Sequence, residues 1–194
     1  YYNISVSFME GLSGLTVWAN DSVGNVNSSY FEFIFDHNYP VITLLTPQNA
    51  SITNANLIEI DVVDTTLESI WYNNGSGNYS LNLPYEIDCS FYEGNYSILV
   101  WANDTIGRVS FKYFEFTFDH IKPVISLLSP ANNTVTDTMW VNVSVSDLTL
   151  HTVWYSWDGG VTNNSIWDGY YNISVSFMEG LSGLTVWAND SVGN

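Results

Sequence analysis

Short runs in which apolar and polar residues alternate follow one another along the whole chain. Between residues 57 and 63, Ile58, Ile60 and Val62 fall on one face of an extended strand and Glu59 falls on the other. A period of two is the pattern of a strand that buries one face. Turn residues rich in Gly, Pro and Asn separate such runs at intervals of about 8–12 residues, which favours a β-sandwich built from short strands.

Seven strands are predicted between residues 36 and 118. On the last of them Phe114, Phe116 and Phe118 share one face, and the same Phe-x-Phe-x-Phe pattern occurs at residues 31–35. A row of aromatic side chains on one face of a strand is typical of a sandwich core. The seven predicted strands cover residues 41–45, 57–63, 69–72, 79–83, 86–92, 98–103 and 110–118.

Internal repeats define the domain organisation. Residues 1–25 recur letter for letter as residues 170–194, and the pentapeptide VWAND starts at positions 17, 100 and 186. The spacing of 83 and then 86 residues indicates tandem domains of that size. We therefore expect residues 1–35 to be the C-terminal part of one domain, residues 36–118 a complete domain, and residues 119–194 a domain without its last strand, in a polypeptide that continues in both directions.

The repeated motifs also carry a family resemblance. PVI-x-LL-x-P opens the domain at residues 40–47 and 123–130, VWYSWDGG spans residues 153–160, and VWANDSVGN occurs late in the domain. Together they resemble the immunoglobulin-like repeat modules of archaeal and some bacterial cell-surface proteins, over essentially the whole chain. The resemblance implies an all-β fold of tandem seven-stranded immunoglobulin-like β-sandwiches, 83–86 residues each and joined end to end. It also implies a place outside the cell, in an S-layer-like protein, an adhesin, a stalk or an extracellular filament, and it brings no catalytic residues.

Charge narrows the range of partners. The chain has 194 residues, with 20 acidic residues against 3 basic ones and a formal net charge of −17. Electrostatic repulsion disfavours nucleic acid and anionic membrane surfaces as partners and favours cations or a basic protein. No apolar run reaches the roughly 20 residues that cross a bilayer, so we expect no direct membrane insertion of this segment.

Asn-x-Ser/Thr sequons are dense, with thirteen in 194 residues. A chain rich in Asn, Ser and Thr produces some of them by chance, and sequons that point into a core stay bare. An acidic, lysine-poor surface with many aromatic residues nevertheless needs a further solvating layer, so we expect N-linked glycans on several of them. The candidate asparagines are Asn3, Asn20, Asn27, Asn49, Asn74, Asn78, Asn95, Asn103, Asn132, Asn142, Asn163, Asn172 and Asn189.

Aspartates recur where the loops of a seven-stranded sandwich meet. Strand order places the loops after the second and sixth strands near the point where the chain enters the domain, so Asp64 and Asp104 should gather near the linker residue Asp36. Three carboxylates form a candidate Ca²⁺ site, because this ion prefers hard oxygen ligands. The alternative is that Asp serves only as a turn residue on solvated loops, since no D-x-D-x-D-G motif is present. The equivalent residues of the next domain are Asp119, Asp147 and Asp190, and no other cofactor is predicted.

Two tryptophans in each domain are candidate contact residues. If Val153 and Tyr155 face inward, then Trp154 faces outward, and so does Trp101 beside an inward-facing Val100. An outward pair on one sheet is a patch for lateral packing or for stacking on a sugar. The alternative assigns the opposite face and makes these residues core tryptophans. The candidates are Trp18, Trp71, Trp101, Trp154 and Trp187.

The remaining reactive side chains indicate no catalytic chemistry. Cys89 is the one cysteine of the sequence, so no intrachain disulfide forms, and its place between Ile87 and Phe91 predicts a buried, inert thiol. His37 and His120 are equivalent residues of successive repeats and have no matched Ser or Cys nucleophile. The CxxC, HExxH and phosphate-loop motifs are absent, so we expect that the chain is not an enzyme.

These patterns favour a structural role outside the cell, as a component of a filament, fibre or surface layer. The expected partners are further copies of the chain, arranged laterally or end to end, and N-linked glycans. Linkers as short as residues 37–39, each followed by a proline, allow little slack. Two alternatives stay open: a carbohydrate- or protein-binding adhesin module that gains avidity from its repeats, and a passive stalk that presents a terminal domain.

Overall fold

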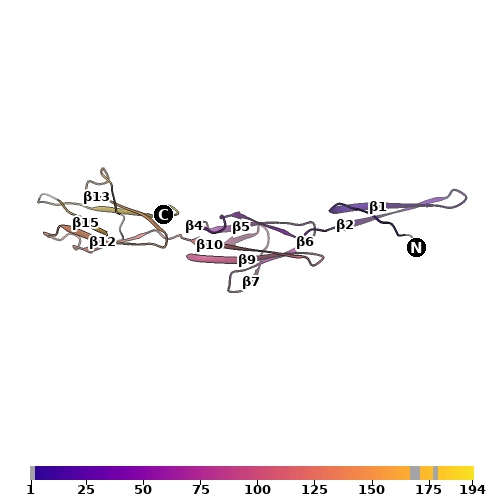
Figure 1. Cartoon of the computed structure of the whole chain (residues 1–194), viewed down its shortest axis with the longest axis horizontal. Coiled ribbons are helices and arrows are strands. Elements are labelled where there is room, and N and C mark those ends of the chain that lie inside the picture. Colours follow the sequence, from indigo (N-terminus) through magenta and orange to yellow (C-terminus); the bar gives the residue numbers. More distant parts are fainter. Residues whose placement is uncertain (1–2, 167–170, 177–178) are drawn as a thin grey trace. The chain divides into compact units, whose positions relative to one another are not determined.

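The computed structural model describes residues 3–166, 171–176 and 179–194. Every regular element among them is a β-strand, and no helix there is long and apolar enough to span a membrane (Figure 1). By the proximity of its residues, the chain divides into two compact units. One comprises residues 1–46, 58–87 and 97–114, and the other comprises residues 47–57, 88–96 and 115–194.

Two sheets form within residues 36–118. The three-stranded sheet has the order β3-β5-β8, and the five-stranded sheet has the order β4-β10-β9-β6-β7. The strands are β3 (Val41–Thr46), β4 (Ser51–Thr53), β5 (Leu57–Val63), β6 (Leu67–Asn73), β7 (Asn78–Ser80), β8 (Glu86–Asp88), β9 (Gly94–Asp104) and β10 (Val109–Phe118). This arrangement is that of an immunoglobulin-like β-sandwich, so the predicted all-β fold class is confirmed.

The same strand order recurs after residue 118. Its sheets have the orders β11-β12-β15 and β14-β13-β16, which match β3-β5-β8 and β7-β6-β9 strand for strand. The strands are β11 (Val124–Ser129), β12 (Trp140–Ser146), β13 (Leu150–Ser156), β14 (Asn164–Ile166), β15 (Tyr171–Ser174) and β16 (Thr185–Asp190). Near the N-terminus, β1 (Gly11–Asn20) and β2 (Val26–Phe35) form an antiparallel hairpin, which corresponds to β9 and β10 in the repeat.

Strand pairing and spatial proximity divide the chain differently. Among the described residues, no sheet combines strands from both sides of residue 36 or of residue 119. The two compact units do not follow these points. The domain boundaries after residues 35 and 118 therefore stay a prediction.

Burial follows the predicted alternation on β5 and β10. Ile58, Ile60 and Val62 have exposed fractions of 0%, 2% and 7%, whereas Asp61 between them is exposed. On β10 the predicted phenylalanine row is buried too, down to an exposed fraction of 0% at Phe118. Complete burial of one such side chain contributes about 1.5–3 kcal/mol, so these rows are a main source of stability. The inward faces predicted for these two strands are confirmed.

The equivalent phenylalanines of β2 are much more exposed. Phe31 and Phe33 have exposed fractions of 48% and 45%, while their equivalents Phe114 and Phe116 on β10 have 7% and 3%. Within the described residues 3–35, β1 and β2 form a two-stranded sheet and no second sheet is present. Burial of this row therefore depends on an opposing sheet and not on the strand sequence alone.

Four strands differ from the sequence prediction, and β9 is one of them because it begins four residues before the predicted start. β4 was not predicted; it pairs in parallel with the end of β10, and three residues are too few to show a period of two. β8 ends at Asp88 because the chain turns there, with the N–H of Tyr92 donating to the carbonyl of Cys89. β7 likewise ends at Ser80, before a turn that residues 82–85 close.

Phe118→Ala is expected to destabilise the sandwich by about 3–5 kcal/mol, because the ring is fully buried and its removal leaves a cavity. Phe111→Ala on the same strand is the matched control; Phe111 is 66% exposed, so its loss should change stability by less than about 0.5 kcal/mol. Hydrogen exchange measured by mass spectrometry reports the opening free energy of β9 and β10 separately from that of other strands. Equal effects of the two substitutions would contradict the assigned buried face.

Candidate functional site

The six predicted aspartates gather into two clusters. In each cluster, one carboxylate oxygen from every member lies within 4.8 Å of the others. Each cluster takes one member from a linker, one from the loop after β5 or β12, and one from the end of β9 or β16. Each cluster lies inside one of the two compact units. The first cluster consists of Asp36, Asp64 and Asp104, and the second cluster of Asp119, Asp147 and Asp190.

A hairpin turn fixes one member of each cluster. Oδ1 of Asp104 accepts hydrogen bonds from the backbone N–H groups of Ile106 and Arg108, at 3.0 and 2.8 Å. Oδ1 of Asp190 accepts the same two bonds in its own turn, both at 2.9 Å. Burial alone would raise the pKa of Asp190, but these hydrogen bonds outweigh burial and lower it. The turn thus occupies Oδ1 and leaves Oδ2 for the cluster.

A threonine ties each cluster to its linker. The backbone N–H of Thr66 donates to Oδ1 of Asp64 at 2.8 Å, and the Thr66 hydroxyl donates to Oδ2 of Asp36. Thr149 makes the same pair of bonds in the second cluster. Sequence reasoning missed both threonines, although the repeated Asp-x-Thr spacing was a visible sign. These bonds hold one oxygen of each carboxylate, and the other oxygens remain for a further partner.

Burial makes these negative charges costly. Asp104 and Asp119 are fully buried, while Asp64 and Asp147 are half-buried. Burial raises the pKa of Asp64, and the negative charges of the other two aspartates in its cluster add to the rise. The pKa of Asp147 is raised for the same reasons. Three like charges at this spacing disfavour full ionisation unless a positive charge joins them.

Arg108 supplies that positive charge in the first cluster. Its Nη1 lies 3.3 Å from Oδ1 of Asp36 and 3.6 Å from Oδ2 of Asp104, and it donates to the Asp36 carbonyl at 2.8 Å. Asn194 stands at the equivalent position and donates from Nδ2 to the carbonyl of Asp119 at 3.2 Å. Arg108 was not among the sequence candidates. The two repeats end this turn with IGR and VGN, and comparing them would have singled out Arg108.

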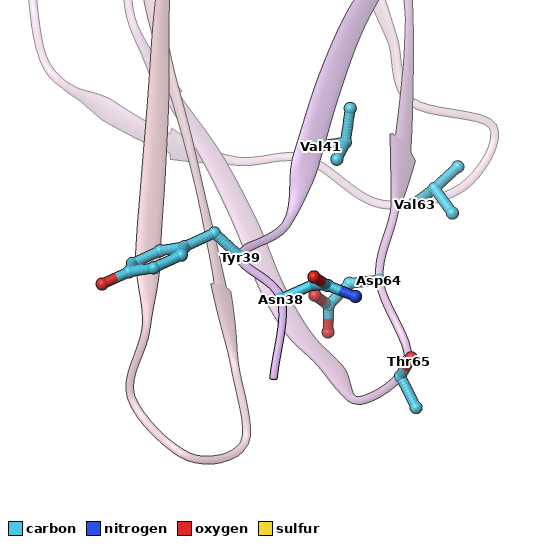
Figure 2. A pocket seen from close by; sticks show the side chains of 6 residues that line it. All are labelled: Asn38, Tyr39, Val41, Val63, Asp64 and Thr65. Atoms are coloured by element: carbon cyan, nitrogen blue, oxygen red, sulfur yellow. The ribbon is translucent and has the colours of Figure 1, made fainter. Parts of the chain in front are cut away.

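A shallow depression lies beside the first cluster (Figure 2). Because Asp64 lines this depression and is half-buried, solvent reaches the cluster from this side. The ring of Tyr39 points away from Asp64 in this view, and its centroid lies 5.9 Å from the Arg108 guanidinium carbon. The lining residues are Asn38, Tyr39, Val41, Val63, Asp64 and Thr65.

The predicted contact tryptophans pair across neighbouring strands. Trp71 lies directly opposite Trp101, and Trp154 lies opposite Trp187. The rings of the two pairs stack with centroid distances of 6.1 and 6.3 Å. All four side chains are half-buried, whereas Trp18 in the β1–β2 hairpin is 67% exposed. Their role in lateral or sugar contact stays a prediction.

The sequon asparagines differ in exposure. Four are half-buried, and the Nδ2 groups of two of these donate hydrogen bonds within the fold: Asn103 to Glu68 at 2.6 Å and Asn142 to Ser129 at 2.9 Å. Glycosylation itself stays a prediction. The half-buried asparagines are Asn74, Asn103, Asn142 and Asn189, and the exposed ones are Asn3, Asn20, Asn27, Asn49, Asn78, Asn95, Asn132, Asn163 and Asn172.

Cys89 and the repeated histidines have structural contacts. Cys89 is fully buried, and its Sγ donates to the carbonyl of Ala55 at 3.3 Å. Burial, together with the nearby carboxylate of Asp88, raises the pKa of this thiol to about 11. The ring of His120 forms a hydrogen bond with the Cys89 carbonyl at 3.1 Å. The backbone N–H of His120 donates to Glu93 at 2.7 Å, so this histidine holds the linker.

No protein-family model matches the sequence, and no curated protein matches it. Among solved structures, the fibronectin(III)-like modules of Clostridium thermocellum CbhA are 20% identical, with a TM-score of 0.36 over 78% of this chain and 86% of that chain. A tetra-tandem repeat from the extending region of a large adhesion protein is 16% identical, with a TM-score of 0.33 over 95% and 54%. A Ca²⁺-stabilised adhesin that helps an Antarctic bacterium to bind ice is 11% identical, with a TM-score of 0.26 over 93% and 56%. The chain spans about half the length of these two adhesin chains, and likenesses at such TM-scores carry nothing about its function.

Cys89 is expected to react with Ellman's reagent at about pH 8 far more slowly in the folded chain than in urea. The thiolate is the reactive form, and a pKa of about 11 leaves roughly one-hundredth of the thiolate that an ordinary cysteine has at that pH. Ser90→Cys adds an exposed thiol next to it and is the matched control, expected to react at once in the folded state. Equally fast reaction of both thiols would show that Cys89 is accessible.

Proposed function

We propose that this chain is part of a structural array outside the cell, a filament, fibre or surface layer built from repeated immunoglobulin-like domains. The observation that carries the proposal is the letter-for-letter repetition of residues 1–25 as residues 170–194, combined with the same strand order in successive repeats. Identical repeats present identical surfaces at regular intervals, which is what a symmetric assembly needs. The proposal includes no catalytic step.

Short linkers support an extended array over independent domains. Asp36 is buried and accepts hydrogen bonds from the Thr66 and Arg108 side chains, and the buried Pro40 restricts the backbone four residues later. In the next repeat, Asp119 is bound by Thr149 in the same way. Side chains of the segment that follows thus hold the start of each repeat in place.

Surface chemistry supports an extracellular, glycosylated protein. The net charge is −17, yet only 12% of the residues are charged, so charged side chains cover little of the surface. Nine sequon asparagines are exposed, in strands, turns and loops of successive repeats. Glycans at such positions would shield exposed aromatic side chains such as Tyr30 and Phe111 from non-specific association.

The stacked tryptophans favour a second candidate function, a carbohydrate-binding adhesin module. Each pair presents aromatic faces at the surface of the sheet, and such faces are suited to stacking on a sugar ring. Repetition of the pair along the chain would add avidity. Glycan-array binding that is lost in Trp101→Ala would favour this module over the purely structural role.

Cryo-electron microscopy of the native material tests the structural proposal. We expect ordered assemblies in which globular domains recur with the two-domain period of 83 and 86 residues, because identical repeats repeat their lateral contacts. Isolated, flexible rods without lateral order would contradict the filament or layer and would favour a stalk or an adhesin.

Glycopeptide mass spectrometry of the same material tests the surface chemistry. Exposed sequons such as Asn27 and Asn132 are expected to carry glycans, because their amides are open to solvent. Asn103 and Asn189 are half-buried beside the aspartates of the two clusters and are expected to stay bare. A chain without glycans at any exposed sequon would contradict the glycosylated surface.

A further inference from the structure

The two aspartate clusters contain the same carboxylates but differ in the side chain that ends the hairpin turn. Arg108 reaches into the first cluster, whereas Asn194 occupies the equivalent position beside the second. We propose that the second cluster binds one divalent cation of the Ca²⁺ type, and that the guanidinium of Arg108 takes the place of that cation in the first cluster.

The cationic neighbour of the first cluster has no counterpart in the second cluster within the described residues. Nη1 of Arg108 lies 3.3 Å from Oδ1 of Asp36 and 3.6 Å from Oδ2 of Asp104. The equivalent atoms of the second cluster are Oδ1 of Asp119 and Oδ2 of Asp190, and both are buried without a hydrogen-bond partner in the protein. Oδ2 of Asp104 also lacks a hydrogen bond, but it has the guanidinium beside it. A buried carboxylate oxygen without a partner is destabilising, so these two atoms indicate where a positive charge binds.

Asn194 makes the same hydrogen bond to the linker backbone as Arg108 does, but it has no charge. Its Nδ2 donates to the backbone carbonyl of Asp119 at 3.2 Å, as Nη1 of Arg108 donates to the carbonyl of Asp36 at 2.8 Å. The turn is therefore joined to the linker in the same way in both clusters. The amide of asparagine is neutral, so it leaves the carboxylates of the second cluster uncompensated.

Within the described ranges, no side chain of the protein neutralises the second cluster. The cationic partners of the ion pairs among the described residues are Arg108 and His37. None of these ion pairs includes Asp119, Asp147 or Asp190. Lys122 lies three positions after Asp119 in the sequence, but its side chain is exposed. The compensating charge therefore comes from solution.

The spacing and the ligand types suit Ca²⁺. Its oxygen ligands lie about 2.4 Å from the ion, so two oxygens on opposite sides of it are about 4.8 Å apart. One carboxylate oxygen from each member of the second cluster lies within 4.8 Å of the others. Asp147 is half-buried, so water can reach the cluster and fill the remaining coordination positions. A set of carboxylates without His or Cys favours Ca²⁺ over Zn²⁺.

The repeat makes this difference periodic. Because residues 170–194 repeat residues 1–25, Asn194 and Asn25 are the same position of the two-domain period, and Arg108 is its counterpart in the alternate domain. An array of such repeats alternates a tethered guanidinium with a bound ion. This alternation would be the same in a fibre, a stalk or an adhesin, so it can be tested independently of the proposed function.

Isothermal titration of CaCl₂ into the metal-stripped chain of 194 residues tests the proposal, in about 0.15 M NaCl to screen weak surface binding. The unaltered chain is expected to bind one ion. Asn194→Arg reproduces the first cluster and is expected to abolish binding, whereas Arg108→Asn reproduces the second cluster and is expected to add a second site. Each variant takes the residue that the other cluster has, so the two are matched controls.

Two sites or none in the unaltered chain would overturn the proposal, and so would unchanged binding by Asn194→Arg. If Arg108→Asn is unfolded without metal, added CaCl₂ is expected to restore its circular dichroism spectrum, and failure to do so counts against the proposal. Asp147→Asn removes one ligand of the second cluster and is expected to lose the single site. Retained binding in this variant would place the ion elsewhere and contradict the proposal.

Discussion

At the linker end of each sandwich, three carboxylates have oxygens within 4.8 Å of one another. The repulsion among their negative charges is the constraint that the surrounding structure has to satisfy. The fold holds them there with directed bonds: turn amides to Oδ1 of Asp104 and Asp190, and threonine hydroxyls to Asp36 and Asp119. These bonds fix the positions of the carboxylates but do not cancel their charge. Each cluster therefore needs a cation, and the chain supplies it from Arg108 in one repeat and has a neutral asparagine in the other.

The same contacts join segments that are far apart in the sequence, so the clusters also have a structural role. The hydroxyl of Thr66 and the guanidinium of Arg108 reach Asp36 across 30 and 72 positions of the chain. Glu10 adds a further connection, because its carboxylate accepts hydrogen bonds from the backbone of His37 and from the hydroxyl of Thr65, both at 2.9 Å. A neutralised cluster thus binds Asp36 to two loops that lie far from it in the sequence.

The sequence was a good guide where a local period or a repeat carried the information. The alternation at Ile58 and Ile60 predicted the buried face of β5, and strand order was enough to expect that the aspartates gather. The three-residue strand β4 has no period to read, because its place depends on a parallel partner more than sixty residues away. The role of Arg108 was missed for a similar reason: the tip of its long side chain lies beside Asp36, which is 72 positions away in the sequence. The stacking of Trp71 on Trp101 likewise follows from cross-strand register, which alternation alone does not specify.

The central claim is that the two clusters obtain their positive charge from different sources. Anomalous diffraction from crystals of the chain grown with MnCl₂, a scatterer that stands in for Ca²⁺ at oxygen sites, tests it most directly. The account predicts one strong anomalous peak, among Asp119, Asp147 and Asp190, and ordinary density for the Arg108 guanidinium among the carboxylates of the first cluster. A peak in both clusters, in the first cluster alone, or in neither would contradict it.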